Sequence, residues 1–198
     1  MPPIAVSDRS LSRPRSTARL PKRHKEGMMT KIWRETGFVE NDPWVIETDE
    51  VKATGAQKPL LSLDELIAKA DGSNDVGLGV LIKPADDVRR LEPYLDRLEI
   101  VAVAFPAFND GRAFSHASLL RQRLGYANEL RAVGDVLIDQ VPLMLRVGID
   151  SFSVTNATAL KRLAENRLPA IPHHYQPAVR DAEAGKGYSW RRQAKPAA

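Results

Sequence analysis

The sequence predicts an α/β protein with an open, mostly parallel sheet, helices on both faces and a small β element before it. Strand-like and helix-like segments alternate four times between residues 76 and 167, which is typical of parallel strands joined by right-handed crossovers. The run 100–105 (IVAVAF) is apolar throughout, as expected of a strand covered on both faces. The chain has 198 residues, fewer than the ~250 of a full eightfold barrel, so the alternative is a half-barrel that a homodimer would complete.

Composition divides the chain into four parts. These are a basic leader (1–27), a β element with a short helix (28–72), an α/β core (73–177) and a tail (178–198). We expect the leader and the tail to be disordered because they lack apolar periodicity. The leader is a basic tail, a targeting segment, or an artefact with the true start at Met28 or Met29.

Charge is unevenly distributed between these parts. The leader holds seven Lys/Arg residues and two acidic ones, so it carries +5 and leaves −1 for the remaining residues of a chain whose total is +4. The basic character therefore belongs to the leader, and the body does not favour nucleic-acid binding.

The residues before the core predict short elements. Runs at 31–34 and 45–47 are strand-like and flank a turn-rich segment, with Trp33 and Trp44 expected to pack. Residues 52–59 read as a loop. Ser62 and Glu65 form a capping box that opens a helix over 63–70.

The core supplies the longer elements. We expect strands at 76–82, 100–105, 129–133 and 151–155, and helices at 86–98, 113–124 and 157–167, with a further helix capped by Asp139 and ended by Gly148. Pro93 lies inside the helix over 86–98 and predicts a kink or a late start there.

Ligands of parallel α/β sheets bind beyond the carboxyl ends of the strands, so we expect a site at that rim. The candidate binding residues are Lys83, Asn109, Asp110, Arg112, Ser115, Asp135 and Gln140. Arg112 and the amides that open the next helix would hold an anion. The alternative is a helix-entry turn in which Arg112 pairs with Asp110. No catalytic residue is assigned.

Three further arginines lie near these candidates. Arg121 and Arg123 are two residues apart on a helix, about 200° around it, so at most one of them faces the site. Arg131 is in mid-strand, and Glu129 lies on the same face of that strand as a partner for its charge.

Several chemistries are excluded or not indicated. The absence of cysteine excludes thiolate catalysis, disulfides and cysteine-ligated iron–sulfur clusters, and a cytoplasmic location fits it. No run is long enough for a membrane helix. The glycines of VGLG lie inside a strand, so no nucleotide-binding motif is present. The histidines make no metal site, and the cofactor is unknown.

The string FNDGRAFSHASLLRQRLGYANELRAVGDVLIDQ, followed by LRVGIDSF, resembles a bacterial family of unknown function, number 934 among such families. The resemblance covers residues 30 to 177. Members are labelled oxidoreductases of sulfite reduction because their genes lie beside those of assimilatory sulfite reductase. The resemblance implies no established catalytic residue.

Two functions are therefore in competition. The first is an accessory protein of assimilatory sulfite reduction that acts with sulfite reductase as its partner. Sulfite reductase itself is excluded, because its sirohaem and iron–sulfur chemistry needs cysteines. The alternative is a small-molecule enzyme or binding protein for an anionic substrate at the rim. Whether the chain is an enzyme is left open by the sequence.

Overall fold

The computed structural model describes residues 30–47 and 51–169, so the leader and the tail lie outside the described residues. The strands are β1 (Lys31–Arg34), β2 (Gly37–Val39), β3 (Trp44–Ile46), β4 (Lys58–Ser62), β5 (Leu78–Ile82), β6 (Leu98–Phe105), β7 (Glu129–Gly134) and β8 (Ser151–Val154). The helices are α1 (Leu63–Gly72), the 3-10 helix η1 (Val88–Arg97), α2 (Arg112–Gln122), α3 (Val141–Arg146) and α4 (Ala157–Ala164).

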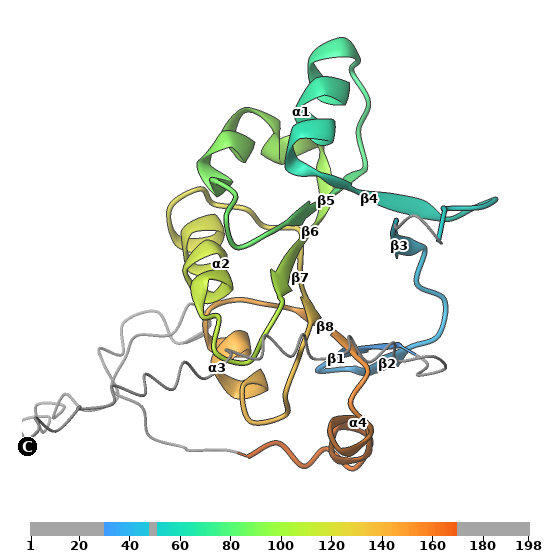
Figure 1. Cartoon of the computed structure of the whole chain (residues 1–198), viewed down its shortest axis with the longest axis vertical. Helices are drawn as coiled ribbons and strands as arrows, with labels where there is room; N and C mark the ends of the chain where they lie inside the picture. Colours follow the sequence, from blue (N-terminus) through green and yellow to red (C-terminus); the bar gives the residue numbers. More distant parts are fainter. Residues whose placement is uncertain (1–29, 48–50, 170–198) are drawn as a thin grey trace, which may run out of the picture.

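All eight of these strands form one curled sheet in the order β2-β1-β8-β7-β6-β5-β4-β3. Strands β3 to β8 are neighbours in chain order and run parallel, while β1 is antiparallel to β8 and to β2. Right-handed crossovers between strands in sequential order place the helices on one face. The α/β class and the mostly parallel sheet are confirmed, and of the two expected architectures the structure has the half-barrel (Figure 1).

The two faces of the sheet have different cores. On the outer face, α1, η1, α2, α3 and α4 pack against alternate strand residues such as Val80, Val103 and Phe152. On the inner face, a smaller cluster contains strand residues only: Trp44, Leu60, Ile100, Ala102 and Val133. The helices therefore cover one face, and the inner face is enclosed by the curl of the sheet itself.

The open side of the half-barrel is crossed by the chain. The link between β2 and β3 joins the two opposite edges of the sheet (Figure 1). Because β1 is antiparallel to β8, Lys31 pairs with Val154 and the described chain starts at the carboxyl ends of the parallel strands. This rim is therefore bordered by the start of the described chain as well as by the loops that follow β3 to β8.

Local signals account for the helix ends, with two corrections. The capping box is present: Ser62 accepts from the Glu65 amide, and Glu65 accepts from the Ser62 amide at 2.9 Å. The segment around Pro93 is a 3-10 helix beginning at Val88, because proline cannot donate the hydrogen bond of a regular α-helix. The prediction that Asp139 caps α3 is wrong, since the cap position belongs to Gln140, without a side-chain bond.

Candidate functional site

The loops after β5, β6 and β7 bring most of the predicted site residues to one rim. Lys83 follows β5; Asn109, Asp110 and Arg112 follow β6; and Asp135 follows β7. Lys83, Asn109, Arg112 and Asp135 are exposed. They lie at the carboxyl ends of adjacent parallel strands, as the sequence predicted.

The turn between β6 and α2 is built around one ion pair. Arg112 donates from Nε and Nη2 to the two oxygens of Asp110, at 3.0 and 2.8 Å. The Arg112 amide also donates to Asp110 at 3.3 Å, which makes this a helix-entry turn. The hydrogen bond from Arg112 lowers the pKa of Asp110, and the same bond raises the pKa of Arg112. The Arg112 side chain is 61% exposed, so the ion pair is open to solvent.

The β5 loop and α2 bring a histidine close to this turn. The Lys83 amide donates to Asp86 at 2.7 Å, which fixes the loop and leaves the Lys83 side chain exposed. His116 is half-buried, and its Nδ1 has no hydrogen-bond partner in the described part of the chain. Burial lowers the pKa of His116, and the charges of Asp86 and Arg112 act on it in opposite directions. The sequence did not single out this histidine as a rim residue.

The end of β7 has a tight backbone geometry. Gly134 has φ +100°, and a Cβ there would lie 2.4 Å from the carbonyl oxygen of Phe105. That carbonyl accepts from the Asp135 amide at 2.7 Å. Only glycine fits this approach, and the geometry places Asp135 at the rim without any partner for its carboxylate among the described residues.

The structure places two other predicted site residues, Gln140 and Ser115, in different surroundings. Gln140 donates to the carbonyl oxygen of Phe108 at 3.2 Å and so ties α3 to the β6–α2 loop. Its own Oε1 is buried without a partner in the described residues. Ser115 instead lies on α2 in a groove with Leu143 of α3 and Val147, the residue after α3, which none of the other candidates lines.

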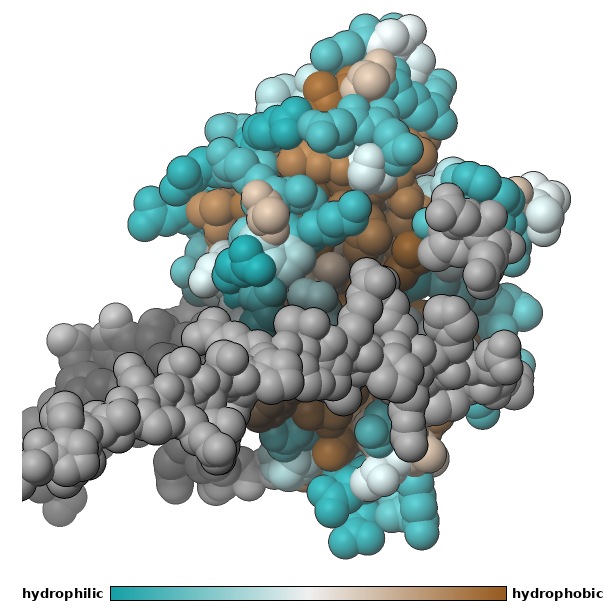
Figure 2. All heavy atoms as spheres, in the orientation of Figure 1, coloured by the Kyte–Doolittle hydropathy of each residue, from teal (hydrophilic) through white to brown (hydrophobic). Residues whose placement is uncertain are grey.

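The rim carries an excess of negative charge. Its charged residues in the loops after β5, β6 and β7 are Asp86, Asp87, Asp110, Asp135, Asp139, Lys83 and Arg112. Phe108 is 58% exposed in the middle of these loops, an unusual position for a large apolar side chain. Figure 2 shows hydrophobic residues of the sheet in the centre of the view, with hydrophilic residues above and beside them.

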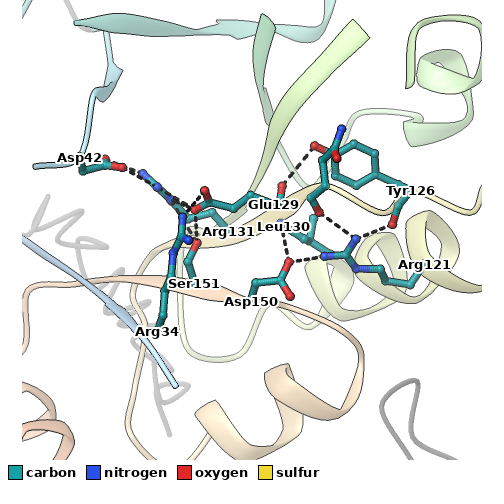
Figure 3. Close-up of polar contacts among 10 residues, drawn as sticks. Arg34, Asp42, Arg121, Tyr126, Glu129, Leu130, Arg131, Asp150 and Ser151 are labelled. Atoms are coloured by element: carbon teal, nitrogen blue, oxygen red, sulfur yellow. Dashed lines mark hydrogen bonds and ion pairs between the residues drawn. The ribbon is translucent and has the colours of Figure 1, made fainter. Parts of the chain in front are cut away.

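Arg121 does not contribute to the rim, because its guanidinium joins two loops inside the molecule, those that precede β7 and β8 (Figure 3). It donates to the carbonyl oxygens of Gly148, Tyr126 and Asn128 and to the carboxylate of Asp150. Asp150 in turn accepts from the Leu130 amide at 2.9 Å. Burial raises the pKa of Tyr126, whose ring lies under the same guanidinium.

Arg131 is the centre of a second internal network, on the inner face of the sheet. It is 2% exposed and donates to both oxygens of Asp42 at 2.7 Å, to Glu129 and to Ser151 (Figure 3). Arg34 of β1 pairs with the other oxygen of Glu129 at 2.5 Å. Burial would lower the pKa of Arg131, but the bonds from Asp42 and the charge of Glu129 outweigh it, and the pKa is raised.

The pairing of Arg131 with Glu129 follows the sequence prediction, whereas Asp42 was missed. Asp42 lies in the link between β2 and β3, 89 residues from Arg131, and no local pattern connects them. The network therefore ties the middle of the sheet to the segment that crosses its open side.

A cavity of about 680 Å³ lies beside this network, between the two ends of the curled sheet. Its floor is largely apolar and includes Ile32, Trp44, Leu60 and Val133. The nitrogen atoms of Arg131 that border it are all engaged in the bonds above. Its size suits a small molecule, and it offers polar and apolar surface in similar amounts.

The residues that the structure describes contain neither a metal-binding cluster nor a membrane-spanning helix. No group of three or more histidine, aspartate or glutamate side chains is placed to hold a metal ion. No helix there is long and apolar enough to cross a membrane.

The sequence matches the model of a family described as "Bacterial protein of unknown function (DUF934)" over residues 79–185. This chain belongs to the DUF934 family. The match confirms the resemblance seen in the sequence, and it covers β6, α2, β7, α3 and β8, which contribute most of the rim. No curated protein and no solved structure matches the chain.

Proposed function

We propose that this DUF934 protein is an accessory component of assimilatory sulfite reduction that binds sulfite reductase through the rim at the carboxyl ends of its parallel strands. The observation that carries the proposal is the make-up of that rim: exposed carboxylates, among them Asp135 and Asp139, lie in loops of the same rim as the exposed side chain of Phe108. An apolar anchor inside a charged margin is the usual composition of a protein-binding surface. The pathway itself rests on the resemblance to the family.

The charge of the rim favours a protein partner over free sulfite. A dianion or monoanion approaching the rim meets more carboxylates than cations, and like charges repel. Arg112, the arginine of the loop after β6, already has both oxygens of Asp110 as its partners. A basic patch on a protein would be attracted to the same surface.

Growth of a deletion strain tests the pathway. The strain is grown with sulfate, sulfite, sulfide or cysteine as the sole sulfur source. Failure on sulfate and sulfite with rescue by sulfide supports a role at sulfite reduction. Normal growth on all four argues against the proposal, and failure on sulfate alone would move the protein to an earlier step.

Binding to purified sulfite reductase tests the surface. We expect co-elution that is lost when Asp135 and Asp139 are both changed to lysine, because the basic patch would then be repelled. Asp96→Lys is the matched control, since Asp96 is exposed near the amino end of β6, at the opposite end of the sheet. Equal binding by all three proteins would remove the rim from the interface.

A small-molecule role is the second candidate, and the cavity of about 680 Å³ favours it. The ligand would be partly apolar, because Arg131 and Asp42 of the wall are paired with each other, and it would meet Lys31 and Glu40, which make no ion pair in the described part of the chain. A ligand that enters should change the fluorescence of Trp44 and raise the melting temperature. Trp44→Phe is the control for the optical signal. Ligands that stabilise the protein without changing Trp44 fluorescence would bind elsewhere.

A further inference from the structure

A groove on the helical face is lined by apolar residues at the margin of the core and by polar and charged residues that the proposed function does not use. It has a volume of about 690 Å³ and lies between η1, α2 and α3. Ser115, Ser118 and Gln122 of α2 line it with polar groups, and Leu143 of α3 is 37% exposed at its edge. The groove combines hydrogen-bonding groups with apolar surface along one side of α2.

Two arginines border this groove from different elements. Arg89 comes from η1 and Arg123 from the residue after α2. Both are exposed, and neither guanidinium has an ion-pair or hydrogen-bond partner within the described residues, in contrast to Arg112, Arg121 and Arg131. No carboxylate lines the groove. It is therefore a positively charged surface, opposite in sign to the rim.

A third arginine, Arg146, adds positive charge to this side of the molecule. Arg146 lies three residues after Leu143 on α3, so the two share one side of the helix. Its Nε is buried and has no hydrogen-bond partner among the described residues.

We propose that the groove between η1, α2 and α3 binds an acidic amphipathic segment of a partner protein. Carboxylates of the segment pair with Arg89 and Arg123, serine hydroxyls bond its polar groups, and its apolar side chains cover Leu143 and Val147. A groove of this kind, with an apolar wall and charges at its margin, is a recurrent way to hold a helix. The proposal does not depend on the proposed function, because that function uses the rim.

The test measures binding of fluorescein-labelled peptides to the full chain at low ionic strength. The probe is a short peptide of glutamate and leucine at helical spacing, and its partner has lysine in place of glutamate. We expect the acidic peptide to bind and the basic peptide not to bind. Changing Arg89 and Arg123 to glutamine should weaken binding about tenfold, since each exposed ion pair contributes a factor of a few.

Control variants separate the groove from other cationic surfaces. Lys161→Gln with Arg162→Gln removes two exposed cations on α4 and should leave the affinity within about twofold. Because every variant keeps residues 1–27, attraction of the peptide to the basic leader is the same in all of them. Equal binding by the groove variant and the parent would overturn the proposal.

A third variant separates a peptide site from a site for small anions. Leu143→Gln should weaken binding of the acidic peptide several-fold, because the apolar side chains of the peptide lose their contact with Leu143. If inorganic sulfate or phosphate instead displaces the peptide at low millimolar concentration and Leu143→Gln has no effect, the groove binds oxyanions and the proposal of an acidic segment is overturned.

Discussion

At the scale of single residues, the arginines decide how this molecule uses its charge. Four arginines lie close together in the sequence, and they have three different structural roles. Arg121 and Arg131 form buried networks, Arg112 pairs within its own turn, and Arg123 faces a groove with no partner in the described part of the chain. The sequence predicted the pairing of Arg131 with Glu129 because residues two apart in a strand share a face.

Removing the Arg131 guanidinium should destabilise the fold strongly. In Arg131→Met, the carboxylate of Asp42 remains in a largely buried site without a cation, and Glu129 keeps only Arg34 as a partner. Loss of one partner from such a network costs about 3–5 kcal/mol. Urea unfolding measures the change, and Arg162→Met on the surface of α4 should stay within about 0.5 kcal/mol of the parent. A small effect in Arg131→Met would mean that the network is solvated.

Because of His116, the folded protein should lose stability as the pH falls. Burial holds its pKa in the folded protein below the ordinary value of 6.5. Below about pH 6.5 the unfolded chain therefore binds more protons at this residue, and stability is lost as the pH falls. Asp86, Asp87, Asp110 and Arg112 are the charged groups that act on it.

The comparison with His116→Gln isolates that contribution. The difference in unfolding free energy between the parent and the variant should shrink from pH 7 towards pH 5, with the parent losing stability faster. Parallel stability curves across this range would show that the imidazole titrates as freely in the folded protein as in the unfolded chain.

At the scale of elements, the helices and strands that have a local sequence pattern were predicted correctly. The apolar run of β6, the capping box of α1 and the alternation from β5 to α4 each depend on neighbouring residues alone. Strands β2 and β4 were missed, and residues 52–59 were expected to form a loop although β4 begins at Lys58. Strand β4 is stabilised by parallel pairing with β3 and β5, which local patterns do not contain, whereas β2 pairs with the strand directly before it, β1.

A substitution at Gly134 tests whether the end of β7 requires glycine. Gly134→Ala places a Cβ against the Phe105 carbonyl and forces a residue with a side chain to keep a positive φ. Relief requires β7 to move away from β6, so we expect a loss of more than about 2 kcal/mol. Gly125→Ala is the matched control, because its φ is +67° with nothing within 4 Å of the added carbon. Its loss should be only about 1 kcal/mol. Equal losses would show that β7 adapts to the side chain.

At the scale of the whole molecule, the choice between a sandwich and a half-barrel depends on strand order. Alternation of strands and helices predicts parallel pairing but not whether successive strands add on the same side. Here β3 to β8 add in sequence, so the helices share one face and the sheet curls. The sequence could place the rim, because strand ends follow from alternation alone, but not its net charge, because that depends on where the arginines point.

The link between β2 and β3 should act as a clamp across the open side of the half-barrel. Asp42 in this link is held by both terminal nitrogens of Arg131, which comes from the middle of the sheet. In Asp42→Ala the link loses its strongest attachment, and the edge strand β3 loses its support on that side. We expect the amide protons of β3 to exchange at least about tenfold faster, while those of β6 change much less.

Hydrogen exchange followed strand by strand distinguishes a clamp from a general stabiliser. Glu40→Ala is the matched control, since Glu40 is exposed in the same link and makes no ion pair in the described part of the chain. Faster exchange confined to β3 and the link would mean that the half-barrel opens locally at the side where the cavity lies, and ligand entry could then use that opening. Faster exchange in all strands together would mean that Asp42 and Arg131 stabilise the whole sheet as one cooperative unit, and the cavity would open only on unfolding.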